Sequence, residues 1–283
     1  MHGLSGTSRY VTVDGIDIHY VEAGQGSPVL LYHGLAAAAF TWRDNIAALS
    51  QHYRVFVFDV LGHGDFDKPD VDYYPGDVAD IMGKAAVQLG ISDAAAIGNS
   101  AGGALAMMMA IKHPELVSSL VLVGSSGLGK EVPSFIRILS MPLVGNVLRS
   151  HRLGGNKLML QSVFLNRSLV SQDLVDELRR TPSLPGAKEA VVRTLLRTVK
   201  LSGVRDEFVL VDRLSGLGIP IMLVWGEQDK MFPVSHAYHA SELTPAARLE
   251  VLSQCGHWPH MERASDFNSL ALDFLSSNEL RNS

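Results

Sequence analysis

The 283-residue chain lacks several features that would point to particular classes of protein. It has one cysteine, Cys255, which excludes an internal disulfide and any metal or iron–sulfur site held by several cysteines. Its net charge is −5, so it has no surplus of basic residues for binding nucleic acid. Its longest apolar run, Ala101 to Ile111, is shorter than the roughly 20 residues that span a bilayer. We therefore expect neither a nucleic-acid partner nor a membrane span.

The residues that are present can build a large core. Hydrophobic residues make up 47% of the chain and charged residues 19%, which excludes a disordered or fibrous protein. The N-terminus has no basic start followed by an apolar stretch, so no signal peptide is predicted and we expect a cytoplasmic protein. At about 150 residues per domain, the length fits two domains or one α/β domain with an insertion.

Short β-branched runs alternate with segments of helical period, a pattern typical of βαβ units around a parallel sheet. The dipeptide Asp14-Gly15 separates two strand-like runs, so the sheet is predicted to open with an antiparallel hairpin. We expect eight strands, at Arg9–Val13, Ile16–Ala23, Val29–Tyr32, Val55–Phe58, Ala94–Ile97, Leu120–Val123, Ile221–Trp225 and Leu249–Leu252. Helices are predicted between them, and a last one contains Phe267 to Phe274.

The alternation breaks between residues 127 and 205, called the cap segment below. Its helical patterns cover Phe135–Leu139, Lys157–Phe164, Gln172–Arg180 and Ala187–Val199, with no clear strand. We interpret the cap segment as a helical lid inserted into a core domain that is made of residues 1–126 and 206–283.

Residues 98–102 read Gly-Asn-Ser-Ala-Gly, a G-x-S-x-G motif. A predicted strand ends at Gly98 and a predicted helix begins after Ser100, which makes the sharp strand-to-helix turn that exposes a nucleophilic serine. Such a turn lies at the carboxyl edge of the sheet, where open α/β sheets bind ligands. The alternative is a helix N-cap serine in a glycine-rich loop.

A serine hydroxyl becomes a nucleophile when a base takes its proton and a third group orients that base. Asp229 and His257 each follow a predicted strand, so both are expected at the same sheet edge as Ser100. The alternatives are a turn-capping aspartate and a core histidine, and Glu227 is the rival acid. The loop after Leu120–Val123 holds no carboxylate, which favours Asp229.

An oxyanion needs two preorganised donors. The backbone amide of Ala101 is one candidate, because it follows the nucleophile. The other is expected in the loop after Val29–Tyr32, with Leu35 as donor and Gly34 allowing a close approach of the substrate. His33 is interpreted as holding this loop by hydrogen bonds.

No cofactor or metal is predicted. The eleven histidines form no H-E-x-x-H spacing, and Pro259 lies between His257 and His260. The glycine loop lacks the G-x-G-x-x-G spacing of dinucleotide sites.

With these residues the chain resembles the α/β-hydrolase superfamily with a helical cap, over nearly all its length. The segment 58–64 is similar to the family's loop after its fourth strand, and there the resemblance implies scaffold roles for Asp59 and His63. Asp65-Phe66-Asp67 stands where that loop usually has a serine. The serine at position 100 argues against the dehalogenases and epoxide hydrolases of the superfamily, which use aspartate.

A narrower resemblance is to carbon–carbon bond hydrolases that cleave vinylogous diketones from aromatic ring fission. It rests on residues 98–100, the pair 102–103, residues 256–258 and the cap stretch 159–170. The oxyanion loop departs from that group, having Leu35 and four alanines. The group's cap arginine falls at Leu178, with Arg179 one position along, and one position turns a helical side chain by about 100°.

The sequence thus predicts an α/β-hydrolase fold and a cofactor-independent serine hydrolase. A carboxylic ester of a medium-sized, largely apolar small molecule is the first expectation, carbon–carbon bond cleavage the alternative, and a non-enzymatic receptor that retains the triad a further one. A homodimer is left open. The substrate-binding candidates are Gly34, Asn99, Met159, Phe164 and Trp258. The cations of the cap segment that could hold an acidic substrate are Arg152, Lys157, Arg167, Arg179 and Arg180.

Overall fold

A computed structural model describes residues 4–141, 144 and 162–282 of the chain, and these residues form one sheet of eight strands. The strand order is β1-β2-β4-β3-β5-β6-β9-β10. The strands are β1 (Thr7–Val13), β2 (Ile16–Ala23), β3 (Pro28–Tyr32), β4 (Arg54–Phe58), β5 (Ala94–Asn99), β6 (Val117–Val123), β9 (Ile221–Gly226) and β10 (Arg248–Leu252). All eight predicted strands are confirmed.

The direction of the strands also agrees with the prediction. β1 pairs with β2 and β2 with β4 in antiparallel fashion, and the other pairs are parallel. Asp14 and Gly15 have φ angles of 51° and 79°, the left-handed values that a two-residue hairpin turn needs. Because β3 to β6 and β9 to β10 run parallel, the loops at their carboxyl ends meet at one edge of the sheet.

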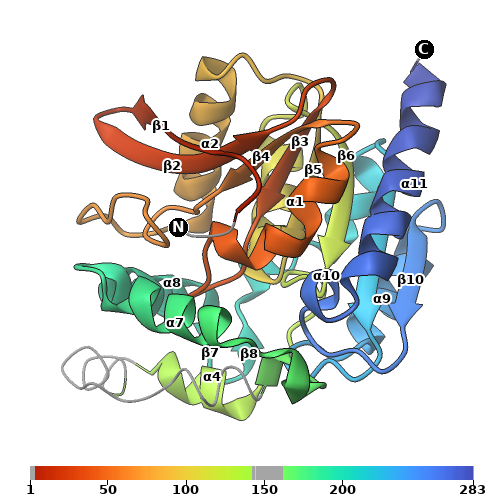
Figure 1. Ribbon diagram of the computed structural model, residues 1–283. Coiled ribbons are helices and arrows are strands. Elements are labelled where there is room, and N and C mark those ends of the chain that lie inside the picture. The colour runs from red at the N-terminus through yellow and green to blue at the C-terminus, as the bar shows by residue number, and fades with distance from the viewer. Residues whose placement is uncertain (1–3, 142–143, 145–161, 283) are drawn as a thin grey trace.

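Helices cover both faces of the sheet (Figure 1). The apolar side chains of α2 (Pro75–Gln88), α3 (Ala101–Lys112) and α9 (Ser235–Leu243) pack on one face. Those of α1 (Arg43–Leu49) and α11 (Ala264–Asn282) pack on the other. The short helices of the core are η1 (Ala39–Trp42), η4 (Asp206–Phe208), η5 (Val211–Gly216) and α10 (Pro259–Glu262). This three-layer arrangement buries both faces, as expected for continuous apolar strands.

In the cap segment the described residues are largely helical, as the sequence pattern predicts. They form α4 (Ser134–Leu139), η2 (Arg167–Leu169), α7 (Gln172–Arg180), η3 (Thr181–Ser183) and α8 (Ala187–Thr198). Figure 1 shows α4, α7 and α8 below the sheet, at the end toward which the arrow of β10 points. Of the predicted helix Lys157–Phe164, residues 157–161 lie outside the described residues.

One element of the cap segment differs from the prediction. A two-stranded antiparallel pair, β7 (Val199–Lys200) with β8 (Gly203–Val204), follows α8 directly. Two-residue strands are too short to show a period of two in the sequence, so the pattern there predicts helix alone.

Hydrogen-bonded arginines join the cap helices to the loop between β4 and α2. Arg180 of α7 donates to both carboxylate oxygens of Asp65, at 2.7 and 3.0 Å. Arg197 of α8 bonds Asp72 at 2.8 Å. The departure at Asp65 noted in the sequence thus gives α7 its ion-pair partner.

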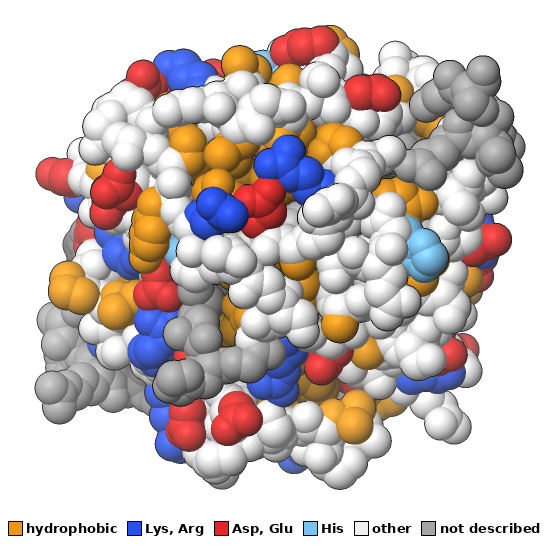
Figure 2. Space-filling model, turned by 45° about the horizontal axis from the view of Figure 1, so that its top comes forward, with side chains coloured by type: hydrophobic (Ala, Val, Ile, Leu, Met, Phe, Trp, Pro, Cys, Tyr) orange, Lys and Arg blue, Asp and Glu red, His pale blue; other side chains and the backbone are white. Residues whose placement is uncertain are grey.

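The described part of the chain contains no helix with the length and apolar character needed to cross a membrane. On the face drawn in Figure 2, basic and acidic side chains lie interspersed among uncharged ones. Such mixing agrees with the small net charge of −5.

Candidate active site

Ser100 lies between β5 and α3 in a strained backbone conformation, with φ 56° and ψ −122°. Ser100 is the N-cap residue of α3, but its side chain makes no capping hydrogen bond, so the hydroxyl is not committed to the helix. Side chains are excluded around it: a Cβ on Gly98 would collide with the carbonyl of Gly102, and a Cβ on Gly102 with that of Tyr32. This is the geometry of a nucleophile elbow.

Asp229 and His257 form a buried hydrogen-bonded pair at the same edge. Nδ1 of His257 lies 2.8 Å from Oδ2 of Asp229, and the two side chains are 2% and 0% exposed. The other carboxylate oxygen accepts the amides of Met231 and Phe232 at 2.7 and 3.0 Å. A carboxylate held by these amides fixes Nδ1 of the imidazole as a donor and leaves Nε2 as the basic nitrogen. Glu227, the rival acid, is exposed and bonds Gln228.

The loop after β6 packs against this pair. A Cβ on Gly124 would lie 3.1 Å from both Asp229 Oδ2 and His257 Nδ1, and Gly124 has a φ of 48°. Both the space and the backbone conformation therefore favour glycine at the place where the sequence offers no carboxylate.

Asn99 links the serine to the histidine. Its Nδ2 donates to the carbonyl oxygens of Val123 and His257, at 2.9 and 3.2 Å. Because Asn99 directly precedes Ser100, this amide fixes the backbone of His257 beside the elbow. The structure thus gives Asn99 a positioning role, and a contact with substrate stays a prediction.

The loop after β3 approaches the elbow closely. A Cβ placed on Gly34 would lie 3.0 Å from the Cβ of Ser100, so a larger residue would crowd the serine. Ala36 has a φ of 59°, and the amide of Ala37 donates to the Gly34 carbonyl at 3.2 Å. Within the described residues, no hydrogen bond uses the amides of Leu35 or Ala101, the two predicted oxyanion donors.

His33 holds this loop, as predicted. Its Nε2 accepts the amide of Val60 at 2.9 Å, so the proton resides on Nδ1, which donates to the carbonyl of Gly34 at 2.7 Å. Burial lowers the pKa of His33 despite the nearby charge of Asp59. A neutral histidine with both nitrogens engaged is a structural residue rather than a second base.

Two of the predicted substrate contacts pack against each other. Phe164 and Trp258 are 3% and 2% exposed and stack edge to face, with ring centroids 5.4 Å apart. Leu178 is 1% exposed and belongs to the same apolar cluster, together with Ala37, Ala38, Phe40, Val163, Leu174 and Met261. Met159, like the cation candidates Arg152 and Lys157, lies outside the described residues.

The described cation candidates of the cap segment point elsewhere. The side chain of Arg179 is 67% exposed and pairs with Asp176, Arg167 is exposed, and Arg180 is bound to Asp65. The question that the sequence left open is thereby answered: Arg179 faces solvent.

Asp59, at the carboxyl end of β4, is a second buried carboxylate that the sequence assigns only to the scaffold. Its oxygens accept the amide of Ala39 at 2.7 Å, the amide of Asp65 at 2.8 Å and Nδ1 of His19 at 2.7 Å. Burial raises the pKa of Asp59, but the His19 hydrogen bond, the nearby His33 and the Ala39 amide outweigh it, and the pKa lies below its ordinary value.

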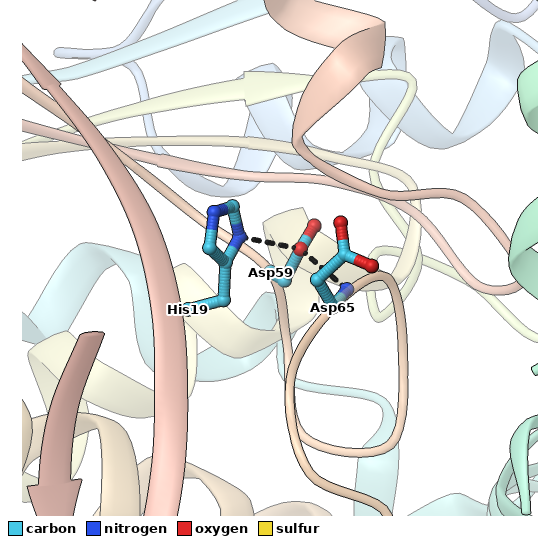
Figure 3. Close-up of side chains that lie close together, drawn as sticks. All are labelled: His19, Asp59 and Asp65. Atoms are coloured by element: carbon cyan, nitrogen blue, oxygen red, sulfur yellow. Dashed lines mark hydrogen bonds and ion pairs between the residues drawn. The ribbon is translucent and has the colours of Figure 1, made fainter. Parts of the chain in front are cut away.

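Figure 3 shows His19, Asp59 and Asp65 side by side. Their potential ligand atoms lie within 4.8 Å of one another, the one such group among the described residues. Each side chain already has a protein partner, since Nε2 of His19 lies 2.9 Å from Ser8 Oγ and Asp65 is bound by Arg180. The group fits an internal hydrogen-bond network better than a metal site.

Comparison with known proteins identifies the family. Residues 27–264 match the family model described as the alpha/beta hydrolase fold. A 2-hydroxy-6-oxo-6-(2'-aminophenyl)hexa-2,4-dienoic acid hydrolase of Metapseudomonas resinovorans is 31% identical over 282 residues, covering 95% of this chain and 90% of that protein.

Solved structures show the same relationship. A serine hydrolase involved in carbazole degradation superposes with a TM-score of 0.80 at 27% identity, covering 96% of this chain and 99% of that one. An enzyme that degrades N-acyl homoserine lactones has a TM-score of 0.75 at 27% identity, with 94% and 100% covered. The chain belongs to the α/β-hydrolase family and is related to its carbon–carbon bond hydrolases.

Proposed function

We propose that the protein is a serine hydrolase in which Ser100 is the nucleophile, His257 the base and Asp229 the group that orients the base. The observation that carries the proposal is the buried Asp229–His257 hydrogen bond of 2.8 Å at the sheet edge where Ser100 has a φ of 56°. Neither Ser100 Oγ nor His257 Nε2 has a hydrogen bond within the described residues. Catalytic hydrogen bonds often tighten only when substrate binds.

The reaction then has two halves. Ser100 Oγ bonds to the acyl carbon while Nε2 of His257 takes its proton, and the amides of Leu35 and Ala101 hold the oxyanion. The bond to the leaving group breaks, and that group takes the proton from His257. Water attacks the acyl-enzyme with His257 again as base, which releases the acid and restores Ser100.

For the substrate we propose an acidic ring-fission dienoate, cleaved at a carbon–carbon bond. This reverses the order that the sequence favoured, because the curated relative with 31% identity is a hydrolase of that class. The leaving group is then carbon, so the dienol must first become a ketone, and the neighbouring carbonyl stabilises the carbanion until it takes the proton.

A carboxylic ester is the second candidate, and one observation favours it. At the position where the resemblance expects a cation, Leu178 is 1% exposed in an apolar cluster. A buried leucine suits a neutral, apolar group better than a carboxylate, which would lie there without a partner.

The experiment compares kcat/KM for a ring-fission dienoate and a short-chain aryl ester on one enzyme preparation. A constant about a hundredfold higher for the dienoate supports carbon–carbon cleavage, and the reverse ratio supports the ester. Ser100→Ala is the control for both substrates. If that variant retains either activity, the proposed nucleophile is wrong.

A further inference from the structure

Glu262, at the end of α10, is a buried carboxylate that the mechanism above does not use. It is 7% exposed and accepts three backbone amides. Oε2 accepts from Leu165 at 2.8 Å, and Oε1 accepts from Gly256 at 3.2 Å and Asn166 at 3.3 Å. A buried carboxylate with several amide donors is held firmly in one place.

Those three amides belong to two segments that matter for the histidine. Gly256 directly precedes His257, and residues 163–166, called the return limb below, belong to the cap segment. The amide of His257 donates to the carbonyl of Val163 at 2.8 Å. The return limb is therefore hydrogen-bonded both to the backbone of His257 and to the carboxylate of Glu262.

The fit at this junction is tight. A Cβ on Gly256 would lie 2.7 Å from the Val163 carbonyl oxygen and 2.9 Å from the Leu165 amide nitrogen, distances that real Cβ atoms do not adopt. Phe164 fixes the return limb from another side by stacking on Trp258. Any shift of the return limb must therefore move the histidine loop as well.

This arrangement needs the two acceptor oxygens of a carboxylate at position 262. Two carboxylate oxygens can accept three amide hydrogens, whereas the side-chain amide of glutamine has one acceptor oxygen and would turn its own N–H groups toward backbone N–H groups. In a site with little access to water, a donor left without an acceptor destabilises the arrangement.

We propose that Glu262 is a positioning residue for His257: it clamps the return limb of the cap segment to the histidine loop, so that the imidazole keeps the place set by Asp229 and Asn99. The clamp makes catalysis depend on the attachment of the cap segment. This inference rests on the proposed function of Ser100 and His257.

The test is Glu262→Gln, compared with Asn45→Ala as a matched control. Asn45 is also buried and holds α10 from the side of α1, donating to the His260 carbonyl at 2.8 Å and to Asn268 Oδ1 at 2.8 Å. Both variants loosen α10, but only the first releases the return limb. The substrate is p-nitrophenyl acetate, which is too small to depend on contacts with the cap segment.

We expect Glu262→Gln to lower kcat about a hundredfold, because misplacing a catalytic group by about 1 Å has that effect. KM should change less than threefold. The rate at which a fluorophosphonate labels Ser100, which also needs the base, should fall in parallel with kcat. Asn45→Ala should keep kcat within threefold even if its melting temperature falls as far as that of Glu262→Gln.

The inference is overturned if Glu262→Gln retains kcat within threefold, or if Asn45→Ala loses as much kcat at an equal fall in melting temperature. Should Glu262→Gln not fold, Glu262→Asp keeps the charge on a shorter side chain and must still lose more kcat than Asn45→Ala. Ser100→Ala and His257→Ala are measured beside them. If these two variants hydrolyse the ester normally, the proposed function has failed; if only Glu262→Gln does, the clamp alone has failed.

Discussion

The described residues include two arrays of serine, histidine and aspartate in which the histidine and aspartate side chains are buried, and the two can be compared. In one, Ser8 Oγ lies 2.9 Å from Nε2 of His19, whose Nδ1 lies 2.7 Å from Asp59. In the other, Nδ1 of His257 lies 2.8 Å from Asp229 beside the elbow of Ser100. By the distances of the His–Asp pairs alone, the two could not be told apart.

The surroundings of the two serines differ. Ser8 lies within β1, opposite Val21 of β2, so its backbone belongs to a strand ladder. Ser100 has a φ of 56° and directly precedes α3, so its hydroxyl lies beside amides that a developing oxyanion can use. The proposed nucleophile thus has a strained turn and nearby amides that Ser8 lacks, and we interpret the array of Ser8, His19 and Asp59 as part of the scaffold.

The largest expected effect separates the two serines. Ser100→Ala should lower kcat by about 10⁵-fold or more, as removal of a triad nucleophile does, while Ser8→Ala should change it less than threefold. Mass spectrometry of the protein treated with a fluorophosphonate should find the label on Ser100 alone. Labelling of Ser8 would contradict the assignment of Ser100 as the one reactive serine of the two.

Substitution of Asp229 should affect catalysis, whereas substitution of Asp59 should affect stability. Asp229→Asn should cost roughly 10⁴-fold in kcat with little change in stability, because it leaves the histidine in the wrong tautomer, as the equivalent substitution does in serine proteases. Asp59→Asn should instead lower the free energy of unfolding by about 1–3 kcal/mol, since it leaves a buried donor without its acceptor.

Kinetics and urea denaturation of both variants check this difference. Glu227→Gln is the control, because that side chain is exposed and bonds only its neighbour Gln228 among the contacts described. A larger kcat loss in Glu227→Gln than in Asp229→Asn would mean that the acid is misassigned.

The grouping of Ser100, Asp229 and His257 can be predicted from the sequence better than that of Ser8, His19 and Asp59, for a physical reason. Ser100, Asp229 and His257 each follow a strand, so the rule that parallel strands end at one edge brings them together without any knowledge of side-chain packing. Ser8 and His19 meet Asp59 through hairpin register and burial, which leave no spacing to recognise. The role of Glu262 escapes sequence reasoning for the same reason, because its partners are backbone amides, which any sequence supplies.

The cap segment is predictable in outline only. The bounds predicted for α7, Gln172–Arg180, are the observed ones, because this helix has a clear amphipathic pattern. The direction of Arg179 could not be predicted, since one position on a helix turns the side chain by about 100°. The ion pair between Arg180 and Asp65 joins residues 115 positions apart, and no local pattern encodes it.

The scaffold side of the comparison also predicts loss of stability in acid. Burial lowers the pKa of both His63 and His260 to about 3, with a smaller contribution from His33 and His257 respectively. The unfolded chain therefore binds more protons than the folded one between about pH 6.5 and 3, so stability is full above pH 6.5 and falls as pH falls.

At pH 5, about 1.5 units below the ordinary pKa of histidine, each of these buried histidines should lower the free energy of unfolding by about 2 kcal/mol, since one pKa unit corresponds to about 1.36 kcal/mol. His260→Phe should reduce the fall in the free energy of unfolding between pH 7 and 5 by about that amount, measured by urea titration. The lowered pKa of Asp59 acts in the same direction at lower pH, because its charge stabilises the fold only while it is ionised. If His260→Phe shows the same fall in the free energy of unfolding between pH 7 and 5 as the unaltered protein, this histidine is already charged in the folded protein.

The smallest expected effect concerns Arg180, and it tests whether the array around Asp59 influences the active site through the cap segment. Arg180 binds the Asp65 carboxylate, and the Asp65 amide donates to Asp59, so Arg180→Ala removes the outer end of that network. The side chain of Arg180 is 35% exposed, and a partly exposed pair contributes about 1 kcal/mol or less.

We expect Arg180→Ala to lower the melting temperature by a few degrees and kcat/KM for p-nitrophenyl acetate by less than threefold. Arg179→Ala, which removes an exposed neighbour on the same helix, should change neither quantity. A tenfold loss of kcat/KM in Arg180→Ala, with Arg179→Ala unaffected, would mean that the array around Asp59 positions the catalytic groups and does not serve the scaffold alone.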